Sequence, residues 1–139
     1  MKVSEAMTVE VQLCTPDDTL RDVAEAMMML NVGLLPVTDN DRLVGIVTDR
    51  DIAVRGVARG RGPDTPVRDV MTQDIKYCFE DQDIDDVTRN MGEIQVRRLP
   101  VVNKDKQLVG IITLGDIAIC KPGDGTAEAL QHISQPGLI

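Results

Sequence analysis

The chain lacks most of the residues on which enzymes build their chemistry. It has a single histidine, His132, close to its end, and it contains neither a Gly-rich P-loop nor a recognisable Ser/His/Asp set. Covalent or acid–base catalysis needs a nucleophile beside a base that activates it, and no such pair is present. We therefore predict a protein that is not an enzyme, and we interpret His132 as a surface side chain.

Long hydrophobic runs are also missing. No stretch of 18 apolar residues occurs, and the start, MKVSEAMTVEV, has neither the basic segment nor the apolar segment of a signal peptide. A soluble, cytoplasmic protein with no membrane partner is expected. The 139 residues suffice for one domain or for two small halves that share a core.

Positive charge is scarce, because 15 Lys and Arg face 23 Asp and Glu and the formal net charge is −8. Nucleic acids and anionic membranes reward a positive field, so neither is predicted as a partner. The arginines are nevertheless clustered: Arg50, Arg55, Arg59 and Arg61 lie close together, and Arg97 is followed by Arg98. The first group forms either a solvated helix face or an anion-binding surface, and both interpretations stay open.

Cysteine is limited to Cys14, Cys78 and Cys120, an odd number without any CxxC spacing. This pattern predicts neither a disulfide framework nor a zinc finger, and no metal site is assigned. Small buried thiols are expected. Because Cys14 and Cys78 occupy equivalent places, a redox or metal role for this pair is the alternative.

What the sequence does contain is a duplication. Met7-Thr8 recurs 64 residues later as Met71-Thr72, and Leu35-Pro36-Val37 recurs as Leu99-Pro100-Val101. Beyond this point the offset is 65, since the second copy carries one extra residue in a turn. The predicted organisation is a first repeat at 3–57, a Gly/Pro-rich linker at 58–66, a second repeat at 67–121 and a C-terminal tail at 122–139.

Hydrophobic periodicity and turn residues predict the order β-α-β-β-α in each repeat. The expected strands are 9–14, 34–37, 43–48, 74–78, 99–102 and 108–113. The first expected helix is capped within 15–18, runs to about residue 31 and is stopped by Gly33. The others are expected at 50–58, 84–95, 116–120 and 126–133. In the first helix the run Met27-Met28-Met29 is interpreted as core and interface filling.

Each repeat has helices on one side of its sheet only, which leaves an apolar sheet face that the repeat cannot bury alone. Two sheets packed face to face across a pseudo-twofold axis would bury both faces. The predicted fold class is therefore α+β (α/β), with two similar halves.

The most informative stretch is 43–54, LVGIVTDRDIAV, with its copy at 108–119, LVGIITLGDIAI. In each copy a strand ends at a Thr, two variable residues follow, and an Asp opens a helix. A hydroxyl and a carboxylate then lie at the strand end beside unused backbone N–H groups, which could hold a small polar ligand. Helix capping alone is the competing interpretation for Asp51 and Asp116. The pairing of Thr with Asp in both copies favours the ligand.

With GIVTDRD and GIITLGD closing the halves and LLPV and RRLPV in their middles, the chain resembles a tandem cystathionine-β-synthase (CBS) domain pair, or Bateman module. It is similar to stand-alone bacterial CBS-pair proteins. The resemblance implies a regulatory homodimer that binds an adenosine-containing ligand (AMP, ADP, ATP, NAD or S-adenosylmethionine) in two clefts and acts on an unidentified regulated protein.

The resemblance also implies which residues form the clefts. The motif Asp would bind the ribose hydroxyls, the Thr would contact ribose or phosphate, and the other repeat would supply the adenine slot. The first cleft would comprise Thr48, Asp49, Arg50, Asp51, Cys78, Phe79, Val96, Arg97 and Arg98. The second would comprise Cys14, Thr15, Val32, Gly33, Leu34, Thr113, Gly115 and Asp116.

Charge distinguishes these two clefts. Arg50, Arg97 and Arg98 are within plausible reach of a phosphate in the first, so a phosphorylated ligand is predicted to prefer it. Phe79 replaces the Thr of the other copy and either stacks on adenine or fills the slot. If it fills the slot, the preference reverses. A ligand-free interaction module and a cysteine-based redox or metal sensor are the alternative functions.

Overall fold

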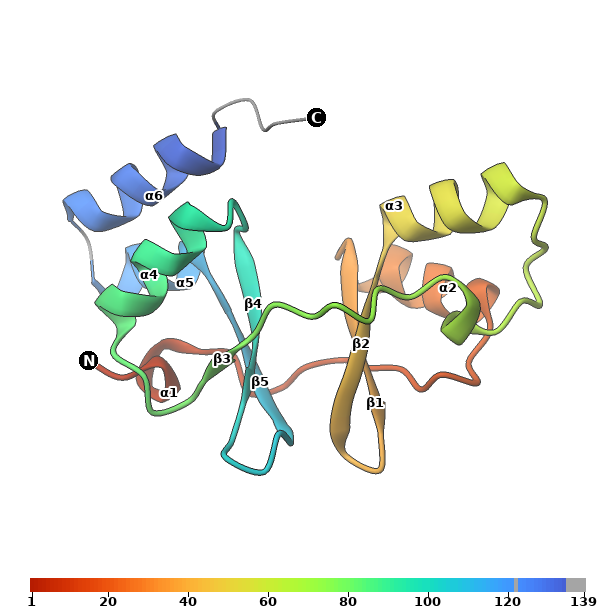
Figure 1. Ribbon diagram of the computed structural model, residues 1–139, viewed down its shortest axis with the longest axis horizontal. Coiled ribbons are helices and arrows are strands. Elements are labelled where there is room, and N and C mark those ends of the chain that lie inside the picture. Colours follow the sequence, from red (N-terminus) through yellow and green to blue (C-terminus); the bar gives the residue numbers. More distant parts are fainter. Residues whose placement is uncertain (122, 135–139) are drawn as a thin grey trace. The chain divides into compact units, whose positions relative to one another are not determined.

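The computed structural model describes residues 1–121 and 123–134, which divide into two compact units (Figure 1). Unit 2 is Gln12–Ile75. Unit 1 combines Met1–Val11 with the described residues from Lys76 onward. The residues that lead into each repeat, 1–11 and 67–75, thus belong to the unit that holds the main part of the other repeat. We call them the leading segments.

Unit 2 is built on an antiparallel hairpin. Its elements are α2 (Leu20–Leu30), β1 (Leu34–Asp39), β2 (Arg42–Thr48), α3 (Asp49–Asp51), a π-helical turn η1 (Ile52–Gly56), and the 3-10 turns η2 (Val57–Arg59) and η3 (Val67–Asp69). The hairpin turns at Asn40 and Asp41, both in the left-handed region that favours such residues. Cys14 extends the hairpin in parallel beside Val37, and Thr72 extends it on the other side beside Ile46.

Unit 1 repeats this plan. Its elements are α1 (Val3–Ala6), β3 (Cys78–Phe79), α4 (Ile84–Glu93), β4 (Arg98–Val102), β5 (Leu108–Thr113), α5 (Leu114–Cys120) and α6 (Asp124–Ser134). β3 pairs in parallel with β4, β4 pairs antiparallel with β5, and Thr8 pairs with Ile111 on β5. The predicted α+β class with two small sheets is confirmed. Of the predicted tail 122–139, α6 covers the expected helix, whereas residues 122 and 135–139 lie outside the described part.

Local sequence explains where the main helices begin and end. Thr19 caps α2 by accepting a hydrogen bond from Asp22 N at 3.2 Å, and Asp83 caps α4. Asn31, with φ 54°, ends α2, and its equivalent Gln95, with φ 58°, follows α4. The prediction that Gly33 stops the first helix was wrong, because a left-handed Asn already provides the stop two residues earlier.

The predicted strand at 9–14 was also wrong. Residues 9–13 form no strand between the paired residues Thr8 and Cys14, and the Val9 side chain is 66% exposed. The physical reason is that these residues carry the chain from unit 1 to unit 2, so their alternating apolar side chains have no sheet to cover. In the same way the chain returns to unit 1 between Ile75 and Lys76, and the strand predicted at 74–78 shrinks to Cys78–Phe79.

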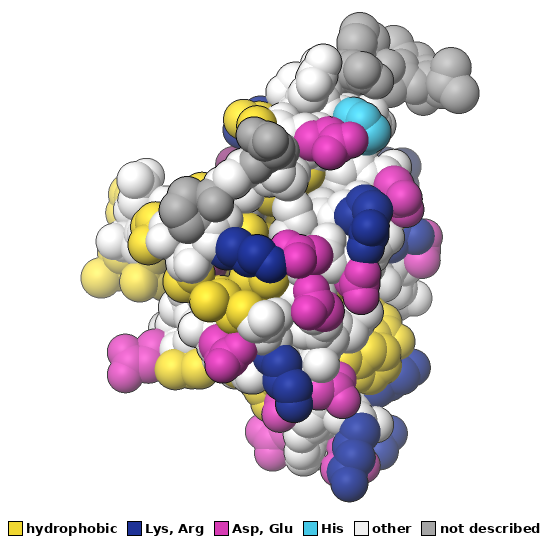
Figure 2. Space-filling view, turned by 90° about the vertical axis from the view of Figure 1, so that its left-hand side faces the viewer, with side chains coloured by type: hydrophobic (Ala, Val, Ile, Leu, Met, Phe, Trp, Pro, Cys, Tyr) yellow, Lys and Arg dark blue, Asp and Glu magenta, His cyan; other side chains and the backbone are white. Residues whose placement is uncertain are grey.

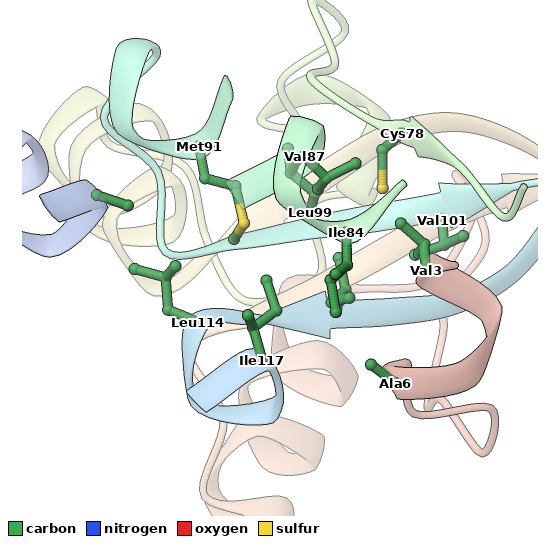
Figure 3. Packing of buried hydrophobic residues seen from close by; sticks show 12 residues of the cluster. Val3, Ala6, Cys78, Ile84, Val87, Met91, Leu99, Val101, Leu114 and Ile117 are labelled. Atoms are coloured by element: carbon green, nitrogen blue, oxygen red, sulfur yellow. The ribbon is translucent and has the colours of Figure 1, made fainter. Parts of the chain in front are cut away.

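The leading segments complete the cores. Val3 and Ala6 of α1 are buried among side chains of α4, β4 and α5 (Figure 3). Their equivalents Val67 and Val70 are fully buried in unit 2. Backbone bonds hold α1 in place, since Val3 N donates to Gln82 O at 3.0 Å and Ser4 N donates to Glu80 O at 2.9 Å.

One difference between the units concerns their helices. α6 packs on α4, where a Cβ added to Gly92 would lie 3.1 Å from the Cα of the buried Ala129. On α2 the position equivalent to Gly92 is Met28, which is 75% exposed, and Met29 is 82% exposed. Met27 is buried, so the predicted core role applies to that methionine only. No helix in the described ranges is long and apolar enough to cross a membrane.

The exchange of leading segments predicts the effect of a distant substitution. We expect Val3→Ala to lower the free energy of unfolding by about 2 kcal/mol, because it removes two buried methyl groups and leaves a cavity. Hydrogen exchange should accelerate in α4 and not in α2. The exposed Val9→Ala is the control and should change stability by less than about 0.5 kcal/mol. Equal acceleration in α2 would contradict the assignment of α1 to unit 1.

Candidate functional site

The two Thr–Asp motifs form the same reciprocal hydrogen-bonded turn. Thr48 Oγ1 accepts from Asp51 N at 3.0 Å, and Asp51 Oδ2 accepts from Thr48 N at 3.0 Å. In unit 1, Thr113 Oγ1 accepts from Asp116 N at 3.0 Å, and Asp116 Oδ2 accepts from Thr113 N at 3.1 Å. Each pair is a capping box, which satisfies two backbone donors where a strand ends and a helix begins. Capping engages Oδ2, so it leaves acceptor capacity on each carboxylate.

The two turns differ in what surrounds the carboxylate. Asp51 is 9% exposed, and Thr72 Oγ1 lies 3.3 Å from both of its carboxylate oxygens. Arg55 Nε lies 3.9 Å from Asp51 Oδ1. Asp116 is half-buried, and within the described ranges its carboxylate accepts a hydrogen bond only from Thr113 N. Sequence reasoning missed Thr72 as a partner of Asp51, although the repeated Met-Thr pair was a signal that could have found it.

Unit 2 brings four predicted site residues together. Leu34 pairs with Thr48 across the hairpin, and Asp49 N donates to Gly33 O at 3.0 Å. A Cβ on Gly33 would approach Asp49 Oδ2 to 3.0 Å, so a larger residue would displace that carboxylate. The residues that precede the Pro-Val strand therefore lie directly beside the Thr–Asp turn of the same unit. Asp49 and Arg50 are exposed at this point, and Val32 is half-buried.

Unit 1 shows the equivalent arrangement with a different charge. Arg98 pairs with Thr113, and Leu114 N donates to Arg97 O at 2.9 Å, so both arginines flank this Thr–Asp turn. Both are exposed, as is Gly115, whereas Val96 is half-buried. The predicted clefts each combine residues of both units, and that grouping stays a prediction.

The remaining predicted site residues lie at or directly after the parallel pairing of each unit, which joins Cys14 to Val37 in unit 2 and β3 to β4 in unit 1. Thr15 is exposed, and its N–H donates to Asp18 Oδ2 at 2.9 Å. Phe79 is half-buried and meets Tyr77 edge to face, with ring centroids 5.7 Å apart. This contact orients the Phe79 ring, and whether the ring stacks on a base or fills a slot stays open between the two predicted alternatives.

The thiols fall into two classes. Burial raises the pKa of Cys14 to about 12, with a further contribution from the Asp18 carboxylate, and burial likewise raises the pKa of Cys78 to about 12. The prediction of buried thiols is confirmed for these two and wrong for Cys120, which is exposed on α5. All three are free. Within residues 1–121 and 123–134 no three His, Cys, Asp or Glu side chains are arranged to hold a metal ion.

A cavity of about 410 Å³ lies between α4 and α6. Its lining includes Asp85, whose Oδ2 accepts a hydrogen bond from Lys121 Nζ at 2.6 Å. That bond lowers the pKa of Asp85 and raises the pKa of Lys121. Figure 2 shows Lys and Arg interspersed with Asp and Glu on this side of the molecule. The sequence offered no signal for this cavity, because it depends on α6 packing against α4.

Comparison with known proteins adds the family. A model of the CBS domain matches the chain twice, at residues 3–56 and 67–135. The CBS domain-containing protein YhcV of Bacillus subtilis (strain 168) is 37% identical over 137 residues, which cover 98% of this chain and 97% of YhcV.

Two solved structures are similar along most of their length. The crystal structure of Hypoxic Response Protein I with two coordinated zinc ions is 35% identical and superposes with a TM-score of 0.77, covering 86% of this chain and 98% of that one. The crystal structure of CBSX2 in complex with AMP is 28% identical and has a TM-score of 0.76, covering 86% and 94%.

The raised pKa values predict selective thiol chemistry. At pH 8 a thiol with a pKa of about 12 is ionised in only about one molecule in ten thousand, and the thiolate is the nucleophile. We expect iodoacetamide to label Cys120 in the folded protein and to spare Cys14 and Cys78, as mapped by peptide mass spectrometry. In urea all three should be labelled. Labelling of Cys14 as fast as Cys120 in the folded state would contradict its burial.

Proposed function

The chain belongs to the CBS-domain family, as its sequence predicted, and we propose that it is a regulatory module that binds an adenosine-containing ligand and controls another protein. The observation that carries this proposal is the duplicated Thr–Asp turn. In each unit the residues that precede the Pro-Val strand lie beside this turn. We propose no catalytic step, since the two CBS matches account for nearly the whole chain. The three free cysteines support a cytoplasmic, reducing location.

Ligand recognition at these turns follows from simple hydrogen-bond chemistry. A ribose diol has two O–H donors, and the carboxylates of Asp51 and Asp116 retain acceptor capacity beyond their capping bonds. The hydroxyls of Thr48 and Thr113 both donate and accept. The AMP bound by the similar CBSX2 supports an adenosine ligand here. We propose the two predicted residue sets, one for each turn, as the binding clefts.

The charge of the exposed side chains supports an order of preference. Arg50 lies within the first turn, between Thr48 and Asp51, and we assign Arg97 and Arg98 of unit 1 to the same proposed cleft. A guanidinium binds a phosphate edge through two parallel hydrogen bonds. We therefore propose that the phosphorylated ligand takes the cleft of Thr48 and Asp51, and that the cleft of Thr113 and Asp116 takes a less charged adenosine compound.

We also propose a homodimer, supported by the apolar surface of unit 2. Met28 and Met29 on α2 are largely exposed, and so is Val57 on the helical segment after α3, where Val54 is 45% exposed. Exposed apolar side chains in such number are typical of protein interfaces, and methionine adapts well to a partner surface.

The ligand proposal is tested with AMP by thermal shift. Wild-type protein should gain about 2.7 kcal/mol at one hundred times Kd. Asp51→Asn should reduce the AMP-induced shift, and by more than Asp116→Asn, because Asn can still cap the helix but loses the charge and one acceptor oxygen in the cleft that the phosphorylated ligand prefers. Asp105→Asn, at an exposed turn, is the control and should respond like wild type. If AMP, ADP, ATP, NAD and S-adenosylmethionine all give no shift at millimolar concentration, the ligand-free interaction module is favoured.

Metal analysis of the native protein tests the cysteine-based sensor.

The dimer proposal is tested by sedimentation. Met28→Glu should weaken self-association at least tenfold, because burying an unpaired carboxylate costs well over 1.4 kcal/mol. Val9→Glu places the same charge on the exposed crossing segment and should leave the dimer intact. Dimers that resist Met28→Glu, or wild-type protein that sediments as a monomer, would contradict a dimer formed through α2.

A further inference from the structure

The carboxylate of Asp51 is held from three directions, all within unit 2. Thr48 N donates to Oδ2 at 3.0 Å, and Thr72 Oγ1 lies 3.3 Å from both oxygens. Arg55, one helical turn further on, places its Nε 3.9 Å from Oδ1, and its Nη1 donates to Met71 O at 3.3 Å. With 9% of Asp51 exposed, these neighbours cover the group that the proposed function assigns to the ribose.

Thr72 and Met71 belong to the second leading segment, which leaves unit 2 after Ile75. Thr72 is attached to β2 by two backbone bonds, in which its N–H donates to Ile46 O at 2.8 Å and Ile46 N donates to Thr72 O at 3.0 Å. The Asp51 carboxylate adds a side-chain bond at this last paired residue. A change in the hydrogen bonds of Asp51 therefore acts directly on the chain segment that continues into the other unit.

Unit 1 supplies a natural control. Thr8 is the equivalent of Thr72, and it makes the same backbone pair with Ile111, at 2.9 and 3.0 Å. In the described part of the chain Thr8 makes no hydrogen bond to Asp116, and Cys120 occupies the position equivalent to Arg55. Asp116 is also more exposed than Asp51. The backbone scaffold is therefore shared, and the side-chain tether is confined to Asp51.

We propose that Thr72 and Arg55 are positioning residues that tether Asp51 to segment 71–75, so that a ligand diol at Asp51 displaces the Thr72 hydroxyl and loosens that segment. This inference rests on the proposed function. A diol and Thr72 donate to the same two oxygens, and the covered carboxylate admits the diol only after Thr72 withdraws. Binding at Asp51 is thus coupled to the crossing chain, whereas binding at Asp116 leaves residues 6–11 unchanged.

Hydrogen exchange without ligand tests the tether itself. Thr72→Val should accelerate exchange in residues 71–75 by about 2- to 10-fold, which corresponds to the net free energy of one hydrogen bond. Thr72→Ser keeps the hydroxyl and should match wild type. Arg55→Gln, at an exposed side chain, should also accelerate exchange there, and it serves if Thr72→Val does not fold. The matched control Thr8→Val should leave residues 6–11 unchanged. Unchanged exchange in Thr72→Val, or equal acceleration in Thr8→Val, would overturn the tether.

Calorimetry with AMP tests the coupling. Thr72→Val should bind AMP about 2- to 10-fold more tightly than wild type, because the competing donor is gone, and Thr72→Ser should bind like wild type. AMP should accelerate exchange in residues 71–75 of the wild-type protein. A purely structural Thr72 would instead give equal or weaker binding in Thr72→Val, which would overturn the coupling. If AMP binds to none of the proteins, the proposed function and the coupling fail together, and the ligand-free exchange still decides the tether.

Discussion

The rest of the structure depends on the burial of four small apolar side chains from the leading segments. Val3 and Ala6 close the core of unit 1, and Val67 and Val70 close the core of unit 2. Each unit therefore needs chain from both sides of the repeat boundary. Because apolar burial is the main stabilising term in folding, neither core is complete when its repeat is taken as one contiguous piece. The two crossing segments follow from this exchange.

The exchange also bears on the regulation that we propose for Asp51. The second leading segment ends its pairing in unit 2 at Thr72, where the Thr hydroxyl meets the carboxylate of Asp51. In unit 1 the equivalent Thr8 keeps the backbone pairing, and among the described residues its hydroxyl makes no such bond. The duplication thus preserved the backbone scaffold while the side chains around the two carboxylates diverged, with Arg55 in one copy and Cys120 in the other. The two turns thus share one backbone arrangement but differ in the side chains that surround their carboxylates.

Capping and ligand binding are compatible at these turns, which explains why the sequence alone supported both interpretations. The reciprocal bonds of Thr48 with Asp51 engage one carboxylate oxygen and one hydroxyl. A carboxylate has about four acceptor positions, so the cap orients the group and leaves part of its capacity for a diol. A helix cap of this kind also fixes the side-chain rotamer, so the ligand that we propose would meet a carboxylate that is already oriented.

Much of the fold could be predicted because it depends on neighbours in sequence. The repeats, the two hairpins, the main helices and both Thr–Asp turns follow from periodicity, turn residues and caps that act over a few residues. Family resemblance added the ligand class and the list of site residues. Errors arose at Gly33, because the left-handed Asn31 already stops α2, and at residues 9–14, because the chain there crosses from unit 1 to unit 2 and has no sheet to cover.

By itself the sequence determined the duplicated elements and the chemistry of their turns, since Thr, Asp, Asn and Pro act on the backbone beside them. Only the tertiary structure decided which core each leading segment completes, that Cys120 is exposed while Cys14 and Cys78 are buried, and that Thr72 binds Asp51. These features depend on contacts between residues 20 or more positions apart, such as Asp51 with Thr72, and the turn and cap signals, which act over a few residues, do not reach that far.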